Sequence, residues 1–160
     1  MIKSIRNIFV RTFYVQMWEN RLRVQPFGAC EAFDEKPFIA LNIHAKKPKI
    51  VAIGNAAYDL RASTSLRVLN PFSHPRLLVA HFIEAEQVLS HALRSHTQFK
   101  PMLTSPIVVM HPREKLEGGV TGIETRLYQE LALGAGAWQV HLHTGDELPI
   151  ETFNPNLINH

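Results

Sequence analysis

The stretch SPIVVMHPREKLEGGVTGIETRLYQELALGAGAWQVHLH, residues 105–143, decides the fold of this chain. It opens with a short apolar run from Ile107 to Met110, which predicts a buried strand. Apolar side chains then recur at helical spacing, at Ile123, Leu127 and Leu131. Gly134 follows as a helix stop, because glycine adopts positive φ without a Cβ penalty. Residues 138–143 alternate like a second strand, so the order predicts a βαβ unit with parallel strands and a right-handed crossover.

Four strands are predicted upstream of this unit. Residues 10–17 and 21–27 alternate between apolar and polar side chains, which predicts a hairpin with its turn at Glu19-Asn20. Residues 37–43 predict a third strand. Residues 49–53 predict a fourth, short one after a basic turn.

Helical patterns fill most of the remaining middle of the chain. Residues 55–66 predict a short helix followed by an irregular loop, and residues 68–72 a short extended piece. The longest helix is predicted to begin at His74-Pro75, because proline is favoured in the first turn of a helix. Its apolar face comprises Leu78, Phe82, Ala85, Val88, Leu89, Ala92 and Leu93.

Composition indicates an ordinary globular domain. The chain has 160 residues, of which 46% are hydrophobic and 19% charged, and this length is enough for one domain with a real core. The net charge of +3 and the scattered basic residues lack the dense stripe of a nucleic-acid binder, so we expect no nucleic-acid partner. Cys30 is the only cysteine, which excludes an internal disulfide and fits a reducing compartment. No apolar run approaches the roughly 20 residues of a membrane span, so we expect a cytoplasmic chain.

The first nine residues form an amphipathic pattern. At helical spacing Ile2, Ile5 and Phe9 lie on one side, with Met1 and Ile8, and Lys3 and Arg6 lie on the other. An apolar face opposite a basic one is typical of a helix in a membrane interface, so we expect peripheral contact with the inner membrane through residues 1–9. The predicted division of the chain is therefore a helix over 1–9, one domain over 10–150 and a polar tail over 151–160.

The predicted order of elements indicates a known architecture. An antiparallel three-strand meander followed by two parallel βαβ crossovers resembles the ribonuclease-H-like fold, which also forms half of an actin-like ATPase. The resemblance implies an α/β domain with a mixed five-stranded sheet and helices on its faces.

Several segments together resemble the bacterial actin homologue MreB, the rod-shape-determining protein. Residues 1–9 are similar to the basic, apolar leader of MreB from Gram-negative bacteria, and residues 51–54 with 56–60 are similar to the VAxVGxxA segment of the family. Residues 130–137 resemble the family's ExAxxAGA-like helix end. The match runs from residue 1 to about residue 150 and corresponds to the first half of an MreB subunit.

The chain departs from this family where the nucleotide phosphates would bind. The family's DLGTANT-like loop provides an Asp for the metal and a Gly that lets backbone N–H groups approach phosphate. Here Gln16 stands at the Asp position, Trp18 stands at the Gly position, and Glu19 adds negative charge. These departures predict a degenerate phosphate loop, with no bound cofactor and no catalysis.

Histidines near the last two strands suggest a different site. His141 and His143 share a strand face and His111 ends the neighbouring parallel strand, with Asp146 close in sequence. Nitrogen and oxygen ligands of this kind suit zinc, so these four residues are a candidate metal site. The alternative is that they are strand-end histidines bonded to backbone or solvent.

The sequence thus predicts a non-catalytic, MreB-like interaction protein. Its expected partners are a second copy of itself or a full-length MreB-type filament protein, in cell-shape or envelope machinery. Two alternatives remain open: a metal-dependent hydrolase on a ribonuclease-H-like fold, and a nucleotide-binding protein completed by dimerisation. The first strand provides Tyr14 and Gln16 where such a hydrolase would place an acid. A decayed gene product without a retained role is a third reading of the sequence.

Overall fold

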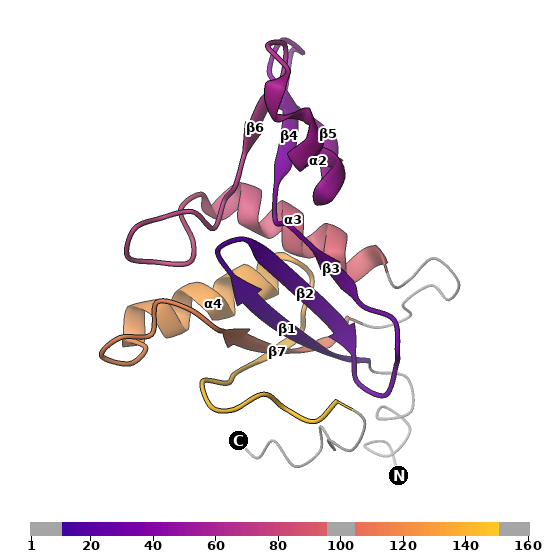
Figure 1. Ribbon diagram of the computed structural model, residues 1–160. Helices are drawn as coiled ribbons and strands as arrows, with labels where there is room; N and C mark the ends of the chain where they lie inside the picture. Colours follow the sequence, from indigo (N-terminus) through magenta and orange to yellow (C-terminus); the bar gives the residue numbers. More distant parts are fainter. Residues whose placement is uncertain (1–10, 96–104, 151–160) are drawn as a thin grey trace.

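The computed structural model describes residues 11–95 and 105–150 (Figure 1). The amphipathic pattern of residues 1–9 and the polar tail of 151–160 lie outside the described residues. The elements in chain order are β1 (Thr12–Trp18), β2 (Arg21–Pro26), β3 (Phe33–Glu35), β4 (Ile39–Asn42), β5 (Lys49–Ile53), α2 (Asn55–Asp59), the 3-10 helix η1 (Leu60–Ala62), β6 (Arg67–Leu69), α3 (Phe82–Ser95), β7 (Ile107–Pro112), α4 (Gly122–Gly134) and β8 (Gln139–Leu142). No helix among the described residues is long and apolar enough to cross a bilayer.

The main sheet has five strands in the order β3-β2-β1-β7-β8. The β3, β2 and β1 strands pair antiparallel, whereas β1–β7 and β7–β8 pair parallel. The predicted mixed five-stranded sheet and its parallel βαβ unit are therefore confirmed. The third strand of the meander is Phe33–Glu35, a strand that was not predicted from the sequence.

The strand predicted over residues 37–43 exists as β4 but belongs to a second sheet. There β4 pairs antiparallel with β5 and with β6, in the order β5-β4-β6. This sheet and α2 form a small lobe, residues 36–69, that projects from the main sheet in Figure 1. The backbone enters α2 through Gly54 at φ 79, where a Cβ atom would meet the carboxylate of Glu35.

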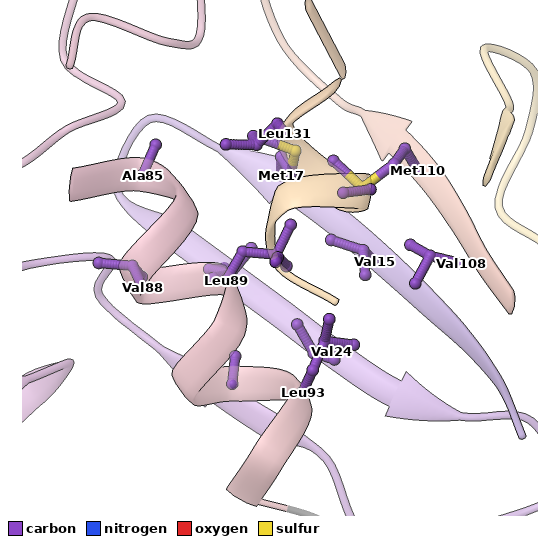
Figure 2. Close-up of a cluster of buried hydrophobic side chains, with 14 of the residues drawn as sticks. Val15, Met17, Val24, Ala85, Val88, Leu89, Leu93, Val108, Met110 and Leu131 are labelled. Atoms are coloured by element: carbon purple, nitrogen blue, oxygen red, sulfur yellow. The ribbon is translucent and has the colours of Figure 1, made fainter. Parts of the chain in front are cut away.

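Both long helices pack on one face of the main sheet. Leu89 and Leu93 of α3 and Leu131 of α4 are buried against the sheet, as Figure 2 shows. The sheet contributes alternate side chains to this core: Val15, Met17, Val24, Val108 and Met110. Among the described residues, the helices therefore lie on this face of the sheet. The opposite face includes Tyr14, Gln16 and His111, and we call the chain that crosses it, residues 143–150, the strap.

Helix α3 begins at Phe82 and not at Pro75 as predicted. The ring nitrogen Nδ1 of His74 accepts the backbone N–H groups of Arg76 and Leu77, at 3.1 and 3.2 Å. The carbonyl of Pro71 accepts those of Ala80 and His81, at 2.7 and 3.1 Å. Side chain and loop acceptors therefore satisfy the backbone donors that a helix would otherwise use.

Candidate functional site at the first hairpin

The predicted phosphate loop is the tip of the β1–β2 hairpin. Trp18 pairs with Arg21, and Glu19 and Asn20 form the two-residue turn between them, as the sequence predicted. Two segments distant in sequence hold this turn. The side-chain amide of Asn70 donates to the Glu19 carbonyl at 2.7 Å, and the backbone N–H of Arg113 donates to the Met17 carbonyl at 2.8 Å.

Charged side chains from the β7–α4 loop bind the turn directly. The backbone N–H of Glu19 donates to the carboxylate of Glu114 at 2.7 Å. The ammonium of Lys115 forms an ion pair with the carboxylate of Glu19 at 2.8 Å and also donates to the His74 carbonyl. The hydrogen bond from Lys115 is the main cause that lowers the pKa of Glu19. A phosphate loop needs free backbone N–H groups, and here a carboxylate of the same chain occupies one.

Trp18, which the sequence resemblance aligns with a glycine, places an indole ring at the hairpin tip. The guanidinium groups of Arg21 and Arg113 lie 5.1 and 5.8 Å from the ring centroid, within the range of cation–π contact. Arg21 also forms a bidentate pair with Asp34, with both N–O distances 2.6 Å. The tip is therefore filled by aromatic and paired charged side chains.

Gln16 lies below the tip and is almost fully buried. It is in register with Arg23 on β2 and His111 on β7. Among residues 11–95 and 105–150, its amide Nε2 has no hydrogen-bond partner, and neither does Nε of Arg23. A buried donor without a partner is costly, which marks this position as a polar site kept inside an otherwise apolar strand.

A hydrogen-bond network joins the polar sheet face to the strap. The backbone N–H of Leu148 donates to the Tyr14 hydroxyl at 3.2 Å, and that hydroxyl contacts Nδ1 of His111 at 2.5 Å. Nε2 of His111 lies 3.0 Å from the Gly145 carbonyl. Because a carbonyl can only accept, Nε2 carries the proton and Nδ1 accepts from Tyr14. His111 is thus a neutral imidazole that holds the strap from below.

Burial and neighbouring positive charge keep His111 neutral. Burial is the largest cause, and His143 and Arg113 add to it, so the pKa of His111 falls to about 4. Burial likewise raises the pKa of Tyr14. Both groups therefore remain uncharged at neutral pH, and neither has a nucleophile beside it in the described network.

The four predicted metal ligands are only partly brought together. The ring centroids of His111 and His143 lie 4.6 Å apart, with the rings arranged edge to face. His143 Nε2 contacts the backbone carbonyl of Asp146 at 2.6 Å and not its carboxylate, and His141 contacts the amide of Gln139. Within residues 11–95 and 105–150, no group of three or more His, Cys, Asp or Glu side chains could hold a metal ion.

Sequence reasoning missed the residues that complete the tip. Glu114 and Lys115 lie between the strand and the helix predicted within residues 105–143, and Asn70 lies in the middle of the extended piece predicted over residues 68–72. The contacts of Asn70 and Glu114 with Glu19 join residues that are 51 and 95 positions apart in the chain. No local pattern signals such contacts, although the positive φ of Lys115, at 59°, marks a tightly turned loop.

Comparison with solved structures identifies the fold. MreB5 of Spiroplasma citri bound to ADP aligns with 84% of this chain at a TM-score of 0.65 and 20% identity. The same protein bound to AMPPNP gives a TM-score of 0.66 at 20% identity over 84% of this chain. A MamK double helical filament gives 0.60 at 12% identity over 83% of this chain. No protein-family model and no curated protein sequence matches the chain.

These similarities establish an actin-like, ribonuclease-H-like fold, as the sequence resemblance predicted. The aligned part corresponds to 38% of the MreB5 chains and 41% of the MamK chain, so the present chain spans well under half of their length.

Proposed function

We propose that this chain is a non-catalytic, actin-like interaction protein. The observation that carries the proposal is the closed hairpin tip, where the carboxylate of Glu114 accepts the Glu19 N–H at 2.7 Å. Glu19, Glu114 and the Trp18 indole together disfavour a phosphate group, because they add negative charge and bulk where backbone donors are needed. The chain would work by binding other proteins in cell-shape or envelope machinery at the inner membrane face.

An apolar groove between the two long helices supports the proposal that the chain binds another protein. It has a volume of about 430 Å³ and is lined by Phe82, Gly122, Ile123, Arg126, Leu127 and Glu130. Ile123 at its rim is 85% exposed, although it begins the apolar stripe of α4. An exposed aliphatic residue beside an apolar groove is typical of an interface. We take a second copy of the chain as its occupant, in line with the filament formed by MamK.

An Ile123→Ser variant should weaken self-association at least about tenfold, because the buried isoleucine would contribute about 1.5–3 kcal/mol at an interface. Light scattering over a range of protein concentrations measures this. Leu133→Ser on the same helix, where the leucine is partly exposed away from the groove, is the matched control and should retain wild-type association. A wild-type monomer that also fails to co-sediment with a full-length MreB-type filament would contradict the proposal.

A nucleotide site completed by a second copy is the other candidate. The guanidinium groups of Arg21 and Arg113 lie beside the Trp18 ring, and Arg23 lies opposite Gln16. The buried Nε2 of Gln16 has no hydrogen-bond partner among the described residues. Such donors suit an anion. The ion pairs of Arg21 and Arg23 with Asp34 already use part of this charge, so the interaction role is the better supported.

A further inference from the structure

Positive charge is concentrated in the small lobe. Residues 36–69 contain six Lys and Arg residues against a single acidic residue, Asp59, which gives the lobe a net charge of +5. The whole chain carries +3, so the remaining residues together carry −2. This asymmetry is a long-range feature that steers the lobe toward negatively charged surfaces.

The lysines at the end of the lobe are available to a partner. Lys46, Lys47 and Lys49 are exposed in and beside the β4–β5 turn, at the outer end of the lobe in Figure 1. Within the part of the chain that the structure describes, these three side chains form no ion pair. By contrast, Lys36 and Arg61 are committed to the Tyr58 ring, at 3.4 and 3.2 Å from its centroid.

Exposed aliphatic side chains lie among these lysines. Ile43 precedes the turn and is 50% exposed, and Ile50 and Val51 follow it at 45% and 51%. Ile50 on β5 and Arg67 on β6 both pair with Leu41 of the central strand, which is buried. The outer end of the lobe therefore exposes both aliphatic and ammonium groups.

We propose that the outer end of the small lobe, residues 43–51, binds the surface of an anionic lipid bilayer. Interfaces between proteins favour arginine and are depleted of lysine, whereas this turn contains three lysines and no arginine. Lysine clusters are attracted to anionic headgroups, and neighbouring aliphatic groups enter the boundary of the acyl chains. Because the lobe projects from the main sheet, its outer end can reach a flat membrane surface. This contact needs neither the groove beside Ile123 nor the segment at residues 1–9.

Vesicle co-sedimentation of the full-length chain tests the proposal. Wild-type protein should bind phosphatidylcholine vesicles that contain phosphatidylglycerol, and it should not bind pure phosphatidylcholine. A Lys46→Gln/Lys47→Gln variant should lose roughly 30-fold in partitioning, since each lysine near an anionic surface contributes about a fivefold change. An Arg76→Gln/Arg94→Gln variant removes the same charge from exposed positions outside the lobe and outside the groove beside Ile123, and it should bind like wild type.

All variants are made also in an Ile5→Glu/Phe9→Glu background, which removes any contribution of the N-terminal apolar face. If Lys46→Gln/Lys47→Gln still reduces vesicle binding in that background, the result supports membrane binding by the lobe. Equal losses in the lobe variant and the arginine control would overturn it, because binding would then follow net charge alone. Unchanged vesicle binding, with loss of binding to polyglutamate or duplex DNA instead, would also overturn it in favour of an acidic protein or a nucleic acid.

Discussion

Lowering the pH from about 7 to about 4 will reduce the free energy of unfolding by about 3 kcal/mol more in the wild-type protein than in a His111→Gln variant. His111 is 1% exposed, and its pKa in the folded protein is about 4 against an ordinary value of 6.5. Between these two values the unfolded chain binds a proton that the folded chain does not. Stability therefore falls as the pH falls through this window, and it is unaffected by this group above it.

This loss of stability at low pH is caused by the direction of the hydrogen bonds that join Tyr14 and His111 to the strap. Protonation would place an N–H on Nδ1 of His111, facing a Tyr14 hydroxyl that already accepts the N–H of Leu148. Chemical denaturation at several pH values measures the effect, and the difference between the two proteins removes the contributions of carboxyl groups that they share. His44→Gln changes an exposed histidine and should leave the pH dependence of the wild type intact. The same pH dependence in the wild type and His111→Gln would refute the assignment.

Replacement of Leu131 by alanine should lower the free energy of unfolding by about 3 kcal/mol, within the usual 2–5 kcal/mol for a buried leucine. Leu131 of α4 is fully buried and belongs to the same core cluster as Met17 and Met110, which Figure 2 labels. Truncation removes apolar area and leaves a cavity that the close-packed core fills only in part.

Leu133→Ala is the matched control for this prediction. It makes the same chemical change two residues away on the same helix, where the side chain is 43% exposed. We expect a loss below about 1 kcal/mol, because solvent replaces most of the lost contacts. Denaturant midpoints of the two variants give the comparison. Equal losses would mean that α4 does not bury the face that the structure assigns to it.

The fold was predictable wherever local pattern and tertiary packing agree. The alternation of β1 and β2 and the strand-helix-strand order of residues 105–143 follow from apolar side chains that recur toward the core along each element. The turn at Glu19-Asn20 is likewise a local feature. These segments carry most of the main sheet, so the ribonuclease-H-like fold could be predicted from them.

The errors arose where distant contacts decide the structure. Strand β3 has only three residues, which is too short for a recognisable sequence pattern. It forms because it pairs with β2. The pattern of β4 predicts a strand correctly but cannot say which sheet it joins. Pro75 fits the first turn of a helix, yet His74 and Pro71 satisfy the backbone donors that follow it.

The candidate site divides in the same way. Gln16, Trp18 and Glu19 could be singled out because the sequence resemblance aligns them with a phosphate loop from which they depart. Glu114 and Lys115 could not, because only the fold brings the β7–α4 loop to the hairpin tip. For the histidines, the sequence correctly suggested that His111 and His143 lie close together. It could not show that a ring nitrogen of each contacts a backbone carbonyl of the strap.

Calorimetric titration of the purified chain with Mg-ATP tests the central claim most directly. The claim is that the hairpin tip, closed by Glu114 and filled by Trp18, leaves no place for nucleotide phosphates. We predict no saturable heat at protein concentrations where light scattering detects self-association. Saturable binding at micromolar affinity would contradict the account, and it would mean that Arg21, Arg23 and Arg113 form a rebuilt nucleotide site in the assembled protein.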